Sequence, residues 1–141
     1  MQSRRTAATA TLSDGQLMLH CLLKIKDRRE DRLRRQMAEL TRQAMQTEVM
    51  QHKCQAQRAE LTQLLNQILT WSGTLTASAL MEQKQKMGRL FHEEHGLALQ
   101  QRSLLETQKR LQERLSMLHQ ELIIVMKKKE KLKGLLNDDG Y

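Results

Sequence analysis

Two long stretches of this sequence place apolar residues at alternating spacings of three and four. The first stretch runs from Leu33 to Ile68 and the second from Leu80 to Leu136. Eight of the eleven positions in the first stripe and twelve of the seventeen in the second are apolar. This heptad pattern is typical of α-helices that pack side by side as a coiled coil, because it keeps one stripe of each helix against its partner.

The two stripes are defined by their positions. The first consists of Leu33, Met37, Leu40, Ala44, Thr47, Gln51, Cys54, Arg58, Leu61, Leu65 and Ile68. The second consists of Leu80, Gln83, Met87, Leu90, Glu94, Leu97, Gln101, Leu104, Gln108, Leu111, Leu115, Leu118, Leu122, Val125, Lys129, Leu132 and Leu136.

The composition supports long helices and argues against a thick globular core. The 141 residues include no proline and only one Phe, one Tyr and one Trp, and good helix formers dominate. No apolar run approaches the roughly 20 residues that span a bilayer, so we expect no membrane insertion. Cys21 and Cys54 lie about 50 Å apart at about 1.5 Å per helical residue, so they cannot pair within one molecule, and a reducing compartment is expected.

The helical pattern is interrupted once, at residues 71–76. Gly73 favours the left-handed conformation that closes a helix, and Ser72, Thr74 and Thr76 can cap the next one. Two helices joined here run antiparallel, so residues whose numbers add up to about 148 should face each other. The predicted fold class is all-α, a long antiparallel two-helix coiled-coil hairpin, and we expect a monomer because the turn supplies each helix with a local partner.

The predicted organisation has five parts. They are a disordered N-terminal arm at 1–13, a first coiled-coil helix at 14–71, a hairpin turn at 72–77, a second coiled-coil helix at 78–137 and a tail at 138–141.

Two parts of the stripes are expected to be irregular. Extending the first stripe upstream places Lys26 and Glu30 on it, with Leu22 and Ile25 beside it, so a shift of register is predicted between about 25 and 33, as a stutter or a change of partner surface. The middle of the hairpin should be the softest part, because polar stripe positions and two helix-interior glycines gather there. These residues are Thr47, Gln51, Arg58, Gly88, Glu94, Gly96 and Gln101, with Glu94 expected beside Cys54 and Arg58.

The positive charge is confined to two segments. Residues 24–35 and 126–133 each carry a net charge of +4, so together they account for the whole net charge of +8. A solvated helix face could explain either segment alone. In a hairpin both segments lie at the end away from Gly73, and their convergence favours a binding role for that end.

Several other functions find weak support. His92 and His95 have a spacing that could bind a metal, but His52 and Cys54, the nearest further donors, point to different sides of a helix, so we expect no metal site. No phosphate-binding loop or catalytic triad is visible, so we expect no catalytic residue, no cofactor and no enzymatic activity. A basic coiled-coil nucleic-acid-binding protein is an alternative, although the basic segments lack aromatic residues for base stacking. A generic cytosolic coiled-coil tether or scaffold is a second alternative.

Four segments together resemble the YscO/SsaO family of type III secretion proteins, which is related in shape to the flagellar stalk protein FliJ. The segments are Leu22–Glu30, Trp71–Leu75, Lys84–Met87 followed by Leu90 and Phe91, and Met126–Lys131. The resemblance is best from about Leu69 to Tyr141 and thin before Leu19, and the arm at 1–11 matches nothing in the family pattern.

The resemblance implies a central stalk in the bacterial cytoplasm at the base of the injectisome, a virulence apparatus for protein transport. Its partners would be the hexameric secretion ATPase, the cytosolic domain of the export gate and substrate chaperones, with no nucleic acid. The residues expected to contact the ATPase are Lys24, Lys26, Arg28, Arg29, Arg32, Arg35, Lys127, Lys128, Lys129 and Lys131. Trp71 and Leu75 are expected to contact the export gate, because they are large apolar residues at the turn and Trp is enriched in interface hot spots; the alternative is that they form an end-cap on Ile68 and Leu80.

Overall fold

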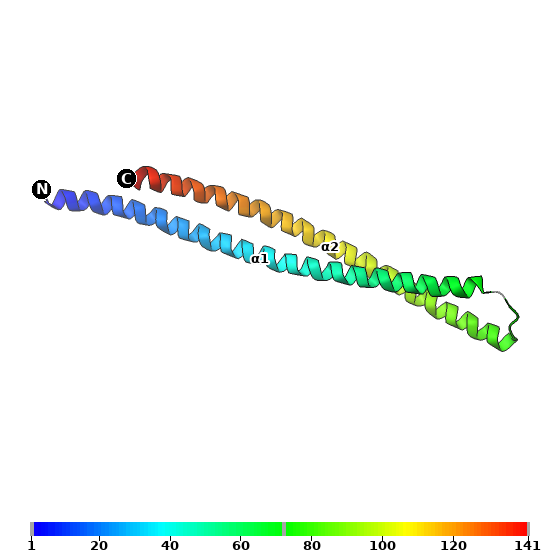
Figure 1. Ribbon diagram of the computed structural model, residues 1–141. Helices are drawn as coiled ribbons and strands as arrows, with labels where there is room; N and C mark the ends of the chain where they lie inside the picture. The colour runs from blue at the N-terminus through cyan, green and yellow to red at the C-terminus, as the bar shows by residue number, and fades with distance from the viewer. Residues whose placement is uncertain (1, 72, 141) are drawn as a thin grey trace. The chain divides into compact units, whose positions relative to one another are not determined.

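The protein consists of two long helices joined by a short connection (Figure 1). In this computed structural model, α1 spans Gln2–Thr70 and α2 spans Ala77–Gly140. The structure describes the backbone of residues 2–71 and 73–140 and the side chains of residues 14–71 and 73–138. No strand occurs in these described residues, and the predicted all-α helical hairpin is confirmed.

The chain forms two compact units, which we describe separately. The terminal unit comprises the described residues of Met1–Thr41 and Glu113–Tyr141, and the turn unit comprises Arg42–Gln112. Each unit therefore contains one segment of α1 and one segment of α2.

The two segments of the terminal unit pack antiparallel around a small apolar core. Leu33, Leu122 and Val125 are buried together, and Met37 and Leu118 pack against them. A step forward along α1, from Glu30 to Arg34, corresponds to a step backward along α2, from Lys129 to Met126, as an antiparallel pair requires. With no thick core available, this narrow stripe provides the hydrophobic stabilisation of the unit.

The turn unit is also an antiparallel pair, but its buried stripe is partly polar. Cys54, Leu61 and Leu65 are buried, and so is Thr47. Thr47 Oγ1 donates a hydrogen bond to the carbonyl of Gln43 at 2.9 Å, so its buried hydroxyl is satisfied within α1. Cys54 Sγ–H donates to the carbonyl of Leu97 at 3.2 Å and connects the two helices.

Burial confirms the heptad stripes that the sequence predicts. Every position of the first stripe, from Leu33 to Ile68, is buried or half-buried, and so is every position of the second stripe from Gln83 to Leu136. Leu80 is the exception, with an exposed fraction of 48%. It lies in the first turn of α2.

The predicted register shift between 25 and 33 is wrong. Lys26 and Glu30 are half-buried, whereas Leu22 and Ile25 are exposed, so the stripe continues upstream with unchanged spacing. Apolar character suggested that Leu22 and Ile25 belong to the stripe. The charged residues can occupy it because a partner on α2 compensates Glu30, as described below.

The predicted facing pairs are displaced along the helices. Counting from the turn pairs Arg58 with Leu90 and Glu30 with Leu118, but Arg58 contacts Glu94 and Glu30 contacts Lys129. Helical side chains lean toward the N-terminus of their own helix, which shifts contacts in this direction by about one position per helix, less than the displacements observed here. Glu94 was correctly expected beside Arg58.

Helix α2 is capped at Thr76, one of the three candidate positions that the sequence predicts. Thr76 Oγ1 accepts a hydrogen bond from the Ala79 N–H at 3.2 Å, which is the bond made by an N-cap residue. The carbonyl of Thr76 accepts the first helical bond, from the Leu80 N–H at 2.9 Å. Ser72, another candidate cap, lies outside the described residues.

The Trp71 ring lies against Gly73, which gives a reason for a glycine at this position. A Cβ atom at this position would lie 2.7 Å from Cη2 and 2.8 Å from Cζ2 of Trp71. The indole ring therefore occupies the space that any other side chain at residue 73 would need.

Helix α1 begins at Gln2, so helical conformation includes most of the stretch for which an arm is expected. This stretch contains three alanines and, before Gly15, no helix-breaking residue. Helix α2 likewise continues to Gly140 into the expected tail. The division into arm, helices, turn and tail stays a prediction.

Candidate partner-binding surface

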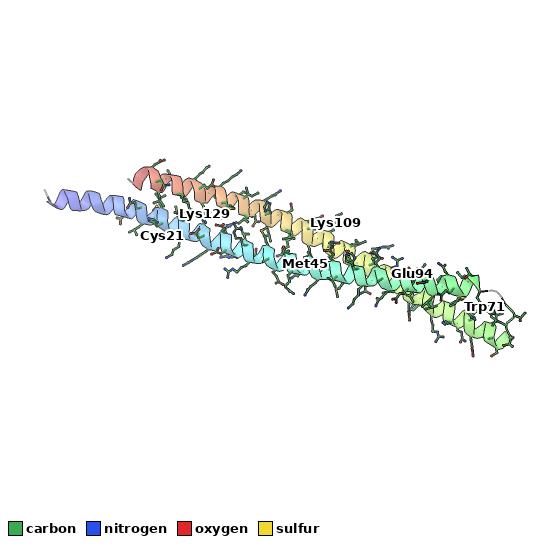
Figure 2. All side chains as sticks on the ribbon, viewed as in Figure 1. Cys21, Met45, Trp71, Glu94, Lys109 and Lys129 are labelled. Atoms are coloured by element: carbon green, nitrogen blue, oxygen red, sulfur yellow. The ribbon has the colours of Figure 1, made fainter. Side chains whose placement is uncertain are left out.

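The terminal unit brings the two basic segments side by side. Lys129 of α2 forms ion pairs with Asp27 and with Glu30 of α1, the latter at 2.5 Å (Figure 2). Arg34 Nη2 of α1 lies 3.9 Å from Met126 Sδ of α2. Residues about a hundred positions apart in the sequence therefore form one surface.

Lys129 is held inside this surface rather than presented on it. Its side chain is only 16% exposed and that of Glu30 only 14%, and Glu30 also accepts a bond from Arg34 Nη2 at 2.9 Å. Hydrogen bonds from Lys129 and Arg34 lower the pKa of Glu30 below its usual range. Hydrogen bonds to Asp27 and Glu30 raise the pKa of Lys129. The cluster is a charged layer of the helix pair.

The remaining cations expected to bind a partner differ in accessibility. Lys26 is half-buried, as is Lys129. Eight of the ten are exposed, namely Lys24, Arg28, Arg29, Arg32, Arg35, Lys127, Lys128 and Lys131. Arg35 is anchored locally, since its Nε donates to the carbonyl of Asp31 at 3.3 Å.

The turn presents apolar side chains to solvent. Trp71 is 51% exposed, and Leu75, Leu69 and Leu80 are exposed as well. The contact of Trp71 with Gly73 directs the ring across the turn. With Leu80 this exposed, the turn residues do not form a closed end-cap, and an apolar surface remains at the turn.

Comparison with known proteins identifies the family. The model of the family described as "Secretion system apparatus protein SsaO" matches residues 19–141. The chain belongs to the SsaO family. The protein of that name from Salmonella typhimurium is 32% identical over 123 residues, which cover 87% of this chain and 98% of the relative. No solved structure matches.

Family membership confirms the resemblance that the four segments indicate. The matched region starts at residue 19, close to the point before which the resemblance is thin. It includes both basic segments and the turn of this SsaO-family chain. The name of the relative denotes a component of an apparatus and no chemical reaction.

Sequence reasoning placed a polar cluster in the turn unit but did not predict its bonds. Arg58 Nε donates to Glu94 Oε1 at 2.9 Å, and Arg58 Nη1 donates to Gln101 Oε1 at 2.5 Å. The Nη2 atom of Arg58 also lies 2.7 Å from Glu94 Oε1. One guanidinium thus bonds two residues a full heptad apart, which its planar fork of donors permits.

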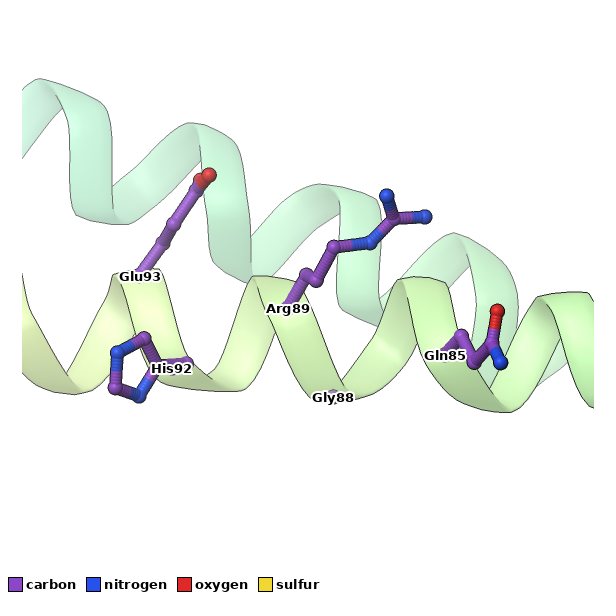
Figure 3. A pocket seen from close by; sticks show the side chains of 5 residues that line it. All are labelled: Gln85, Gly88, Arg89, His92 and Glu93. Atoms are coloured by element: carbon purple, nitrogen blue, oxygen red, sulfur yellow. The ribbon is translucent and has the colours of Figure 1, made fainter.

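The hollows of the turn unit do not suggest an active site. One of about 550 Å³ is lined by Gln85, Gly88, Arg89, His92 and Glu93 (Figure 3). It arises where Gly88 lacks a side chain, and a Cβ atom there would meet nothing within 4 Å, so the hollow is open. Among the described residues no group of three or more His, Cys, Asp or Glu side chains could hold a metal. His52 instead lies 3.8 Å from Glu48.

No helix within the described part of the chain is both long and apolar enough to cross a bilayer. Cys21 is exposed and Cys54 is buried, and neither forms a disulfide.

Proposed function

We propose that this protein is a central stalk of a bacterial type III secretion system, located in the cytoplasm at the base of the injectisome. The terminal unit would insert into the hexameric secretion ATPase, and other surfaces would meet the export gate and substrate chaperones. Membership of a family of secretion system apparatus proteins supports this role. The observation that carries the proposal is that the two basic segments lie side by side in the terminal unit, where eight of their cations are exposed.

The proposed mechanism is mechanical coupling. The ring would hydrolyse ATP, and this chain would contribute no catalytic residue. The exposed cations would be attracted to acidic side chains or carbonyl groups lining the pore of the ring. Because a two-helix stalk lacks the symmetry of a hexamer, its position in the pore would differ between subunits, and conformational changes of the ring would pass to the gate.

Charged side chains bound by their own neighbours are less suited to contact a partner. Lys129 is engaged by Asp27 and Glu30 and would orient the two helices, so its contribution to binding would be indirect. Among the cations expected to contact the ATPase, Arg28, Arg32 and Arg35 on α1 and Lys127, Lys128 and Lys131 on α2 are exposed and form the most direct test set.

The first experiment is co-purification with the secretion ATPase of the same bacterium. Charge reversal at Arg28, Arg32 and Arg35, or at Lys127, Lys128 and Lys131, should abolish co-purification and leave helicity unchanged, because exposed charges contribute little to folding. The matched control reverses Lys84, Lys86 and Arg89, which are exposed cations of the turn unit. Normal ATPase binding by both variants, with loss of binding to DNA, would favour the nucleic-acid alternative.

The proposed gate contact involves Trp71 and Leu75. Large exposed apolar side chains suit an interface hot spot, and Trp is the residue most enriched there. Replacing both with Ala should reduce secretion sharply, while ATPase binding and the melting temperature change little. A large loss of helix stability with normal gate binding would mean that the two residues only cap the turn.

A further inference from the structure

A second stripe of exposed residues runs beside the buried stripe on each helix of the terminal unit. On α1 it contains Met18, Leu22, Ile25, Arg29 and Arg32, spaced alternately by four and three. All five are exposed, and Ile25 has an exposed fraction of 56%. The spacing places them on one side of the helix, next to the stripe that contains Lys26 and Glu30.

Helix α2 carries a matching stripe with the same spacing. It contains Ile124, Lys128, Lys131 and Leu135, all exposed, with exposed fractions of 53% for Ile124 and 50% for Leu135. Upstream, Met117 and Glu121 continue it. Each row therefore combines exposed aliphatic residues with two consecutive cations, Arg29 and Arg32 on α1 and Lys128 and Lys131 on α2.

The two stripes lie on the same flank of the helix pair. The opposite flank is marked by Asp27, Arg34 and Met126, since Arg34 contacts Met126 across the pair. Each second stripe lies on the other side of its buried stripe, so in an antiparallel pair the two stripes face the same way. In the turn unit, residues at equivalent heptad positions, Gln57 and Glu93, likewise line a single hollow.

We propose that this flank binds an amphipathic helix of a partner protein, with apolar residues facing the groove and Asp or Glu along its edges. A third helix that packs into the groove between two needs exposed aliphatic side chains on both, which Leu22 and Ile25 on α1 and Ile124 and Leu135 on α2 provide. The cations Arg29, Arg32, Lys128 and Lys131 favour a partner with acidic edges. Between Met18 and Arg32 the α1 row contains no acid, and between Met117 and Leu135 the α2 row contains only Glu121. This goes beyond the proposed ATPase contact, which requires only the exposed cations.

A second copy of this chain does not fit the flank. Stacking two such flanks would place Arg29, Arg32, Lys128 and Lys131 against an equal set of cations, and like charges in contact are unfavourable. The apolar rows would bury aliphatic area with either kind of helix, so the charge decides in favour of an acidic partner.

The test uses a synthetic three-heptad peptide with Leu along one stripe and Glu at the flanking positions, labelled for fluorescence anisotropy. The full chain should bind it, and the variant Ile25→Gln with Ile124→Gln should bind at least about tenfold more weakly, since the two changes remove one aliphatic side chain from each row. The matched control is Met45→Gln with Val49→Gln, two exposed apolar residues of the turn unit, which should bind normally. Circular dichroism should show the same helicity for all three proteins.

Three results would overturn the proposal. A peptide of the same composition with its Leu positions scrambled could bind equally well, which would reduce the effect to charge alone. Phosphatidylglycerol vesicles could bind the chain through Ile25 and Ile124 while the peptide does not, which would assign the flank to a membrane surface. A doubled mass in light scattering that the Ile25 and Ile124 changes abolish would assign it to self-association. None of these measurements uses the ATPase, so a failure of the proposed ATPase contact would leave this test intact.

Discussion

Lys129 illustrates how a charged residue occupies the buried stripe of a two-helix protein. Its ammonium group lies between the carboxylates of Asp27 and Glu30, and Arg34 provides a second cation for Glu30. Burying an ion costs solvation energy, which is recovered only when its partners are well placed. Here the arrangement also fixes which part of α2 faces residues 27–34 of α1.

The cluster predicts a dependence of stability on acid. The pKa of Glu30 is lowered by Lys129 and Arg34, so its contribution to folding is present above the ordinary value of 4.5 and is lost as pH falls through the lowered pKa. Urea unfolding between pH 6 and pH 3 should show this loss. The Glu30→Gln variant should be less stable at pH 6 and should have a flatter acid profile. Identical profiles for the two proteins would contradict the assigned role of Glu30.

Variants of Arg58 and Glu94 can separate two quantities. One is the contribution of this polar pair to the free energy of unfolding, and the other is the cost of leaving one partner alone. Arg58→Leu alone should destabilise the protein by about 1–3 kcal/mol, because it leaves Glu94 on the stripe without its cation. Arg58→Leu with Glu94→Leu should recover this loss, because two apolar residues then pack on the stripe. Urea unfolding of Arg58→Leu, of Glu94→Leu and of the double variant provides the measurement. A double variant less stable than either single variant would contradict this account.

At the scale of the helices, periodicity determined what could be predicted. Positions such as Leu33, Leu61 and Val125 were identified because burial follows the heptad spacing. Leu22 and Ile25 belong to a second stripe beside the first. Their hydrophobicity alone suggested that this side of α1 is buried, but it is exposed. The pairing of Glu30 with Lys129 does not follow from the sequence, because counting residues from the turn places Glu30 opposite Leu118 instead of Lys129.

The candidate surface was likewise predicted only in part. Charge counting identified both basic segments, but only the structure separates the exposed Arg32 from the half-buried Lys129. The sequence predicts that Gly73 closes a helix, whereas its close contact with the Trp71 ring is seen only in the structure, because a glycine can serve either purpose.

The polar stripe of the turn unit predicts uneven local stability. Thr47, Gln51 and Arg58 replace aliphatic residues there, and the buried Gln51 Nε2 has no hydrogen-bond partner among the described atoms. Amide exchange should be faster around Gly88 and Gly96 than at residues 111–125, where Leu and Val dominate the stripe. Exchange measured by mass spectrometry with uniform protection across both regions would count against this difference.

The turn can be tested through the chain's single tryptophan. Gly73→Ala places a methyl group where the Trp71 ring lies, so the ring must move. The fluorescence emission of Trp71 should shift to longer wavelength, while helicity stays within a few percent of the original. The control Gly134→Ala has open space at its Cβ and should leave the emission unchanged. An unchanged spectrum for Gly73→Ala would show that the ring does not rest on Gly73 in solution.

At the scale of the whole molecule, the net charge and the exposed aromatic side chains belong to different units. The net charge of +8 resides entirely in two segments that belong to the terminal unit. The exposed aromatic residues Trp71 and Phe91 belong to the turn unit. We propose that this division corresponds to two partners, an ATPase ring for the basic surface and an export gate for the turn.

The central claim is that the basic surface stimulates the secretion ATPase. The most direct measurement is the rate of ATP hydrolysis by the purified ATPase as this protein is added. We predict stimulation by the unmodified protein and by the variant reversed at Lys84, Lys86 and Arg89, and none by the variant reversed at Arg28, Arg32 and Arg35. Equal stimulation by all three proteins, or no stimulation by any, would contradict the claim.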